Sequence, residues 1–260
     1  MMRVLRQLFA MIALMPLSLM AQEAETADFT SDLFGGITGV DILPKGRLQW
    51  ETFAYYEHST MYDYDSKTWC PNTSVLRYGI SNSTELSLQG AWFHTTDEDE
   101  KYSGFGDLAV GVKTRLFEGW KAVPAISLRG LLYFPGGEND YFLPDNFSYQ
   151  LDLIFYNPLT SWCALGYMGA MIWDDLPKPT VVFGGYLDFF LTDRLTFSVE
   201  ERNCRYGFEE ENYLDTWAGL TLSYQLLPRV ELGLTSDISL RYPKDFFNLS
   251  LGVAWQLTKK

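Results

Sequence analysis

Hydrophobic and polar residues alternate along most of the chain with a period of two. The stretch 104–117, GFGDLAVGVKTRLF, shows this clearly. Its apolar face is formed by Leu108, Val110, Val112, Thr114 and Leu116. Its more polar face is formed by Asp107, Ala109, Gly111, Lys113 and Arg115. Because successive side chains of a β-strand point to opposite faces, this pattern predicts a strand with one apolar face.

The start of this stretch also matches the glycine pattern of dinucleotide-binding loops. Gly104, Gly106 and Ala109 have the G-x-G-x-x-G/A spacing. Such a loop needs a buried strand before it and an amphipathic helix after it, so that backbone N–H groups face the pyrophosphate. The preceding residues, TTDEDEKYS, are hydrophilic, and the following ones alternate as a strand does. The context therefore argues against a dinucleotide site.

The same alternation recurs in twelve segments, and no helical pattern separates them. They span residues 46–57, 72–80, 84–94, 104–116, 123–134, 147–156, 161–173, 179–191, 195–205, 213–226, 230–240 and 246–257. The connections alternate between short turns, such as 81–83, and longer loops, mostly acidic, such as 94–103. This arrangement is typical of outer-membrane barrels. We therefore predict an all-β fold: a closed antiparallel transmembrane β-barrel of about 12 strands over residues 46–260, with short periplasmic turns and longer acidic outer loops.

Aromatic residues gather near both ends of the segments, as the two interfacial girdles of a barrel require. Those expected at the loop ends are Trp92, Phe93, Phe134 and Trp173. Those expected at the turn ends are Phe155, Trp162, Phe189 and Trp255. The alternative is a secreted β-sandwich, which buries one face of each sheet in a dry core. The number and length of the segments and the charges on their polar face favour the barrel, whose closure removes edge strands.

The N-terminus has the three parts of a secretory signal peptide. Arg3 and Arg6 precede an apolar run from Leu8 to Met20, and Ala21 is a suitable cleavage residue. We assign residues 1–21 to this signal and 22–45 to a periplasmic leader. The apolar, glycine-rich part of the leader, residues 33–40, is suited to a plug in the lumen. The predicted location is the outer membrane of a Gram-negative-type bacterium, with membrane lipid and the barrel-assembly machinery as partners.

Charged residues on the polar face are the candidates for selectivity, because a barrel interior tolerates charge that faces water or is paired. The candidate lumen-lining residues are Arg47, Glu51, Arg77, Lys113, Arg115, Arg129, Asp152, Tyr186, Asp188, Glu200 and Arg202. Inward aromatic side chains are expected to narrow the bore: Phe53, Tyr55, Tyr156, Tyr167, Tyr186 and Phe190. The alternative is a lumen closed by these paired side chains.

Other chemistry receives little support. Neither His58 nor His94 has a serine two residues after it, so a lipid-modifying dyad is not expected, and no catalytic residue is assigned. The acidic runs 97–100 and 209–211 lack a turn residue that would fix ligand geometry, so no metal site or cofactor is expected. Three widely spaced cysteines predict free thiols. Loss of two arginines with the signal takes the formal charge from −13 to −15, which disfavours nucleic acid as a partner.

Several stretches resemble a known family. SGFGDLAVGVKTRLF followed by PAISLRGLLYFPGG, together with DILPKGRLQWE and SVLRYGISNSTELSLQG, is similar to the outer-membrane proteins associated with meta-pathway phenol degradation. The chain departs from the family at Pro135-Gly136-Gly137, where Pro-Thr-Gly is frequent, and in ending without a terminal aromatic residue. The resemblance implies a barrel that passes small, often hydrophobic compounds. The expected function is a narrow channel or transporter for small solutes, hydrophobic or aromatic ones included. The alternatives are a closed structural barrel and a lipid-modifying enzyme.

Overall fold

The structure, a computed structural model, describes residues 31–32, 36–60, 65–98, 100–120, 123–136, 142–208, 214–243 and 245–258. The predicted signal peptide 1–21, residues 22–30 and 33–35 of the leader, and the acidic run 209–211 lie outside these ranges. No helix in the described part of the chain is both long and apolar enough to cross a membrane.

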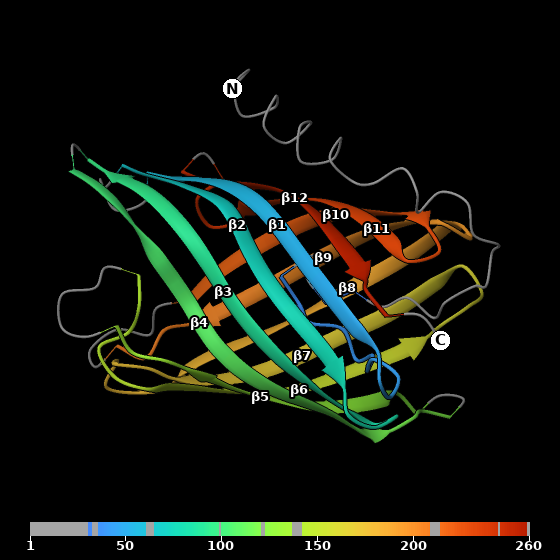
Figure 1. The fold of residues 1–260 in the computed structure, drawn as a ribbon. Helices are drawn as coiled ribbons and strands as arrows, with labels where there is room; N and C mark the ends of the chain where they lie inside the picture. Colours follow the sequence, from blue (N-terminus) through green and yellow to red (C-terminus); the bar gives the residue numbers. More distant parts are fainter. Residues whose placement is uncertain are drawn as a thin grey trace.

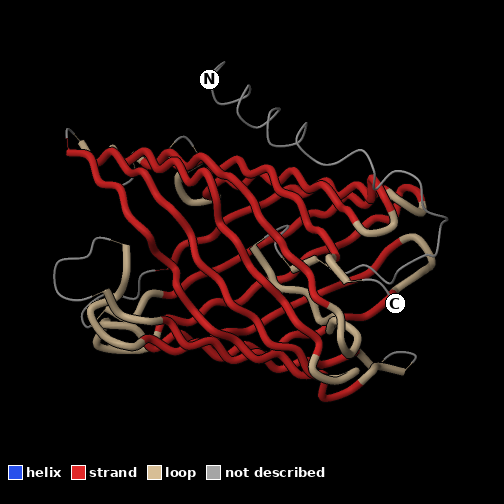
Figure 2. The backbone as a smooth tube through the Cα atoms, in the orientation of Figure 1, coloured by secondary structure: helices blue, strands red, loops and turns tan. Residues whose placement is uncertain are grey.

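Twelve antiparallel strands form a closed barrel within the described ranges, as predicted (Figures 1 and 2). The strands are β1 (Leu48–Ser59), β2 (Ser66–Gly79), β3 (Thr84–Asp97), β4 (Glu100–Phe117), β5 (Ala125–Tyr133), β6 (Ser148–Pro158), β7 (Cys163–Trp173), β8 (Thr180–Thr192), β9 (Leu195–Arg205), β10 (Leu214–Leu227), β11 (Val230–Ser239) and β12 (Phe246–Gln256). Each strand pairs with the next one in the sequence, and β12 pairs with β1, so the sheet has no free edge.

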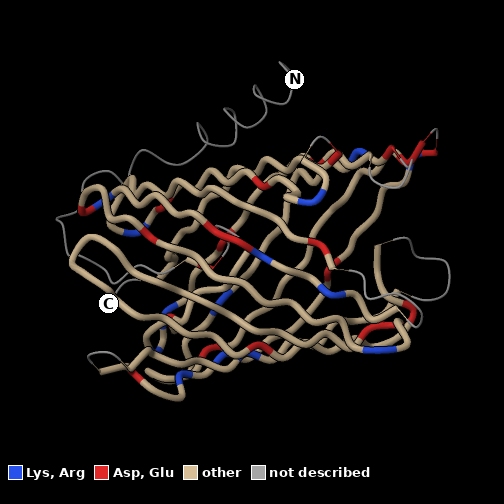
Figure 3. The backbone as a smooth tube through the Cα atoms, turned by 180° about the vertical axis from the view of Figure 1, so that it is seen from behind, with Lys and Arg blue, Asp and Glu red and all other residues tan. Residues whose placement is uncertain are grey.

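The register places apolar residues outside and polar residues inside. Leu76, Leu88, Val110 and Leu132 are cross-strand neighbours on β2 to β5, and the first three are 38%, 49% and 39% exposed. This row belongs to the apolar band that faces lipid in a barrel of this type. An inward-facing row three residues away along the strands is charged: Glu85, Lys113, Arg129 and Asp152 are successive neighbours on β3 to β6. Figure 3 shows charged positions within the strands as well as in the connections.

Three details of the sequence prediction were wrong. The segment 95–103 is not a loop: β3 continues to Asp97 and β4 begins at Glu100, with Glu98 at φ 51° in the turn. The strands continue because Thr95 and Asp97 keep the inward phase and are buried. β2 likewise begins at Ser66 instead of residue 72.

Two aromatic residues have the opposite orientation from the one predicted. Phe93 points inward and is buried against Tyr55 and Phe142, so it is not part of the outer girdle. Tyr167 points outward and stacks on Phe155, with ring centroids 4.6 Å apart, so it does not narrow the bore. Phe93 has the inward phase of Glu85, Ala91 and Thr95 on β3, and Tyr167 has the outward phase of β7 among small residues, so the sequence prediction assigned both to the wrong phase.

The glycine pattern on β4 has a packing role. A Cβ atom at Gly104 would lie 2.7 Å from the Phe142 ring, and one at Gly106 would lie 2.7 Å from the Phe142 carbonyl oxygen and from Phe93. The connection between β5 and β6 therefore approaches β4 so closely that only glycine fits. Phe142 stacks on Phe93 with ring centroids 5.2 Å apart and an interplanar angle of 16°. An aromatic cluster thus narrows the lumen close to the outer ends of β3 and β4.

The apolar outer face predicts a strong effect of charge at Val110. We expect Val110→Arg to lower the free energy of unfolding by about 2–4 kcal/mol, because it places a charge in hydrocarbon near the middle of the membrane. Val110→Thr is the matched control and should cost much less. Urea unfolding in lipid vesicles, followed by the heat-modifiable shift on gels, measures both variants. Equal stability of the two would show that Val110 does not face lipid.

Candidate functional site in the barrel lumen

Described residues that precede β1 lie inside the barrel. We call the described residues between 31 and 44 the leader segment; it is blue in Figure 1. Ile37 and Val40 are 5% and 2% exposed, and they pack against Ile154, Met168 and Ala170 on β6 and β7. Apolar burial therefore holds the leader segment against one wall of an otherwise polar lumen.

Barrel side chains also bind the backbone of the leader segment. Three strands on different sides of the lumen take part, namely β9, β3 and β5. The Gly36 N–H donates to both carboxylate oxygens of Glu200, at 2.8 and 2.9 Å, and the Leu43 N–H donates to Glu85 at 2.7 Å. The Ser127 hydroxyl donates to the Val40 carbonyl oxygen at 2.6 Å. These contacts satisfy backbone groups that an irregular segment would otherwise leave unpaired in the lumen.

Arg77 on β2 is the centre of a buried ion cluster. Its guanidinium is 1% exposed and lies between Glu51 on β1, at 2.7 Å, and Glu85 on β3, at 2.8–2.9 Å. Asp32 of the leader segment completes the cluster at 3.2 Å from Arg77 and also pairs with Lys113 on β4. A buried charge is costly unless it is paired and hydrogen-bonded, so the cluster and the leader segment depend on each other.

The ionisation of Asp32 follows from these neighbours. Burial opposes its charged form, but the positive charges of Arg77 and Lys113 outweigh burial and hold the pKa of Asp32 below its ordinary value. Asp32 therefore remains an anion at neutral pH. The attraction that it contributes is present above its ordinary pKa of 3.8 and is lost only as the pH falls through the lowered value.

The remaining basic candidates on this side are paired as well. Arg115 contacts Asp41 of the leader segment at 3.1 Å and Glu118 at 2.9 Å. Arg129 pairs with Asp152, which is fully buried, at 2.5 Å. The walls formed by β1 to β6 therefore carry many charges whose partners are other lumen side chains or the leader segment.

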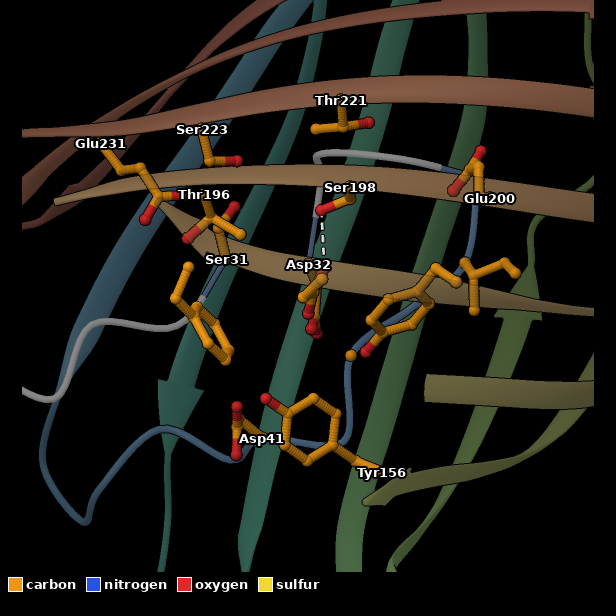
Figure 4. A pocket seen from close by; sticks show the side chains of 15 residues that line it. Ser31, Asp32, Asp41, Tyr156, Thr196, Ser198, Glu200, Thr221, Ser223 and Glu231 are labelled. Carbon is orange, nitrogen blue, oxygen red and sulfur yellow. Dashed lines mark hydrogen bonds between the residues drawn. The ribbon is translucent and has the colours of Figure 1, made fainter. Parts of the chain in front are cut away.

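The opposite wall borders open space. A cavity of about 200 Å³ lies between the leader segment and strands β8 to β11 (Figure 4). Its carboxylates come from both sides: Asp32, Asp41, Asp188, Glu200 and Glu231. The aromatic side chains that line the cavity are those of Tyr156, Tyr186 and Phe190. Asp188 accepts a hydrogen bond from the Ser198 hydroxyl at 2.5 Å.

The candidate residues thus separate into two groups, with two outliers. Glu51, Arg77, Lys113, Arg115, Arg129 and Asp152 lie on the charged side, and Tyr186, Asp188 and Glu200 border the cavity. Arg47 lies at the turn end and donates to the Thr258 carbonyl at 3.3 Å. Arg202 lies over the Trp217 ring, 5.2 Å from its centroid.

Sequence reasoning missed several acidic residues of the lumen, among them Asp32, Asp41, Glu231 and Asp237. Asp32 and Asp41 are in an irregular segment without periodicity, so no pattern could place them against Lys113 and Arg115. Glu231 could have been found, because it has the same phase along β11 as the buried Thr235 and Asp237.

The structure also brings together a histidine and a serine that the sequence analysis did not connect. His94 on β3 and Ser103 on β4 are cross-strand neighbours on the outer face, and His94 Nδ1 lies 2.6 Å from Ser103 Oγ. The Trp92 indole N–H, which can only donate, binds His94 Nε2 at 3.2 Å. In a neutral ring the proton then resides on Nδ1, so His94 donates to Ser103 instead of accepting its proton. This arrangement does not suit a general base.

Other reactive groups are isolated. Cys70, Cys163 and Cys204 are free and buried. Within the ranges that the structure describes, no three His, Cys, Asp or Glu side chains are placed to hold a metal ion.

The fold is similar to those of solved outer-membrane barrels. An outer-membrane channel from Pseudomonas putida F1 has a TM-score of 0.64 at 14% identity, over 90% of this chain and 100% of that chain. The NanC porin has a TM-score of 0.56 at 12% identity, over 80% of this chain and 100% of that chain. The translocator domain of the autotransporter NalP from Neisseria meningitidis has a TM-score of 0.51 at 11% identity, over 83% of this chain and 90% of that chain. At these identities the likeness shows the fold alone. No curated protein sequence matches the chain.

A family model matches more than half of the sequence. It is described as "Putative MetA-pathway of phenol degradation" and covers residues 31–175. The match begins where the leader segment begins and continues to the connection after β7, so it includes the leader segment, the Arg77 cluster and the β4 glycine pattern. The chain is therefore an outer-membrane-type β-barrel that belongs to this family, as the resemblance predicted.

Proposed function

We propose that the protein is a narrow outer-membrane channel for small solutes, hydrophobic or aromatic ones included, and that the leader segment limits its bore. The observation that carries this proposal is the cavity of about 200 Å³ between the leader segment and β8 to β11. It borders the lumen wall of β8 to β11, which the leader segment contacts through the Gly36–Glu200 hydrogen bonds and through the packing of Tyr186 against Ile37 and Val40. The charges of the other wall are covered by their ion-pair partners. Solutes would pass along β8 to β11.

The size and lining of the cavity support small solutes. Sites for drug-sized ligands enclose about 300–1,000 Å³, so this cavity admits only smaller molecules. Ring faces of Tyr156, Tyr186 and Phe190 border it, and the Phe93–Phe142 pair narrows the lumen further toward the outer ends of β3 and β4. Such rings offer contacts to apolar or aromatic parts of a solute.

The outer face supports placement in a membrane. Its exposed apolar residues would contact outer-membrane lipid, and the barrel-assembly machinery would insert the chain, as is general for barrels of this type. Both partners belong to the proposal.

A closed structural barrel is the second candidate. The observation that favours it is the paired state of Arg77, Lys113, Arg115 and Arg129, which resembles a packed interior more than a water-filled pore. Lipid modification has less support, because the hydrogen bond from Trp92 leaves His94 in the wrong tautomer for activating Ser103.

Conductance in planar bilayers separates the first two functions. We expect the purified, heat-modifiable protein to give small, discrete current steps, because the cavity leaves a narrow aqueous path. A preparation that is fully folded by the gel-shift criterion and gives no steps would show that the barrel is closed.

Deletion of residues 22–40 behind an intact signal tests the leader segment. We expect a severalfold rise in single-channel conductance, because the deletion opens the side of the lumen occupied by Ile37 and Val40. Heat-modifiable folding should persist, since all twelve strands remain. Unchanged conductance in the folded deletion variant would assign the constriction to barrel side chains such as Tyr186.

A point variant makes the same test without shortening the chain. Asp32→Asn removes the leader charge that pairs with Arg77 and Lys113, so we expect a conductance between those of the wild type and the deletion. Glu118→Gln is the control: it also breaks an arginine pair, but Glu118 is 77% exposed and lies in the turn after β4. Equal currents from both variants would contradict a role for Asp32 in holding the leader segment.

A further inference from the structure

Most charge in the lumen is segregated by side; Arg202 on β9, which lies over the Trp217 ring, is an exception. We call Arg77, Lys113, Arg115 and Arg129 on β2, β4 and β5 the basic wall, and Asp188, Glu200, Glu231 and Asp237 on β8, β9 and β11 the acidic wall. The two walls face each other across the leader segment. The leader segment covers charges of the basic wall and touches the acidic wall at Glu200, so it decides which sign of charge a solute meets.

The basic wall is neutralised. The neighbouring strands β1, β3 and β6 supply Glu51, Glu85 and Asp152, and the leader segment supplies Asp32 and Asp41. Carbonyl oxygens of the leader segment add to this: Gly39 accepts from Lys113 at 3.2 Å, and Val40 accepts from Arg115 at 3.2 Å. Arg77 and Lys113 are 1% and 2% exposed as a result. An anion in the lumen therefore finds these cations already covered.

The acidic wall is open to the cavity. Asp188, Glu200 and Glu231 line it together with the two leader carboxylates, and none of the described lining residues is Lys or Arg. Glu231 makes no hydrogen bond or ion pair with the described part of the chain. Asp32 Oδ1 is buried without a hydrogen-bond partner among the described residues, although Oδ2 is paired. The cavity thus presents acceptor oxygens that lack donors.

We infer that the path along the acidic wall is selective for cations, and that its solutes are small organic cations such as protonated amines, including those that carry an aromatic ring. A channel lined by carboxylates between low-dielectric walls raises the local concentration of cations and repels anions. The faces of Tyr156, Tyr186 and Phe190 add cation–π contacts, which favour an organic cation over a hydrated metal ion. This inference rests on the proposed channel function.

The leader segment acts on selectivity in two ways. It contributes Asp32 and Asp41 to the cavity, and it covers the basic wall. Without it, four cations of that wall would face three carboxylates from the neighbouring strands β1, β3 and β6. Its removal therefore should widen the path and weaken the preference for cations at the same time, a pairing of effects that a simple obstruction would not produce.

Reversal potentials in a KCl gradient measure the selectivity. The wild type should favour K⁺ over Cl⁻ severalfold. Glu231→Gln combined with Asp188→Asn should bring the permeability ratio toward one, and deletion of residues 22–40 should lower it while raising conductance. Glu201→Gln is the matched control, because Glu201 is a carboxylate on β9 that points to the outer face. It should leave the ratio unchanged.

Benzylammonium and benzoate test the solute class, since they share a ring and differ in charge. Uptake into vesicles containing the wild-type protein should be severalfold faster for benzylammonium, and the Glu231→Gln and Asp188→Asn pair of changes should reduce that difference. Preference for Cl⁻ and benzoate in a conducting channel would overturn the inference and leave the channel function intact. Absence of current from fully folded protein would overturn the channel function, and this inference with it.

Discussion

The pairing of β12 with β1 closes the sheet, and the other features of the molecule depend on this closure. In hydrocarbon every backbone N–H and C=O group needs a partner, which a sheet provides only when it has no edge. Closure also turns the two faces of each strand into two environments. Apolar residues such as Leu88 and Val110 occupy the outside, and charged residues such as Lys113 occupy the inside.

A closed barrel with charged residues inside must satisfy those charges in a narrow space. Arg77 illustrates the constraint: it is almost fully buried, so its guanidinium needs carboxylates from two neighbouring strands and from the leader segment. The leader segment is held in turn by apolar contacts with β6 and β7 and by the Glu200 carboxylate. Electrostatics and packing thus hold one irregular segment in the lumen and leave a cavity between it and strands β8 to β11, which is the basis of the proposed path.

Fold alone does not identify the function. Barrels with this fold include a channel, a porin and the translocator domain of an autotransporter, so functional arguments must come from the lumen. The lumen of this chain combines a neutralised basic wall, an acidic cavity and ring faces, a combination suited to selective passage of small molecules. The pair of His94 and Ser103 on the outer face shows that two residues of suitable type in contact do not make a catalytic site. The hydrogen bond from Trp92 to His94 determines a tautomer that cannot accept the serine proton.

The sequence by itself determined the strand pattern, the inward and outward faces and most of the charged lumen residues, because alternation is a local property that lipid on one side enforces. It failed at Phe93, where an aromatic residue of β3 points inward, and at Asp97, where the strand continues into acidic sequence. Only the tertiary structure decided which charges meet. Asp32 reaches Lys113, 81 residues away, because closure and apolar burial bring the leader segment to β4, and no local pattern encodes such a contact.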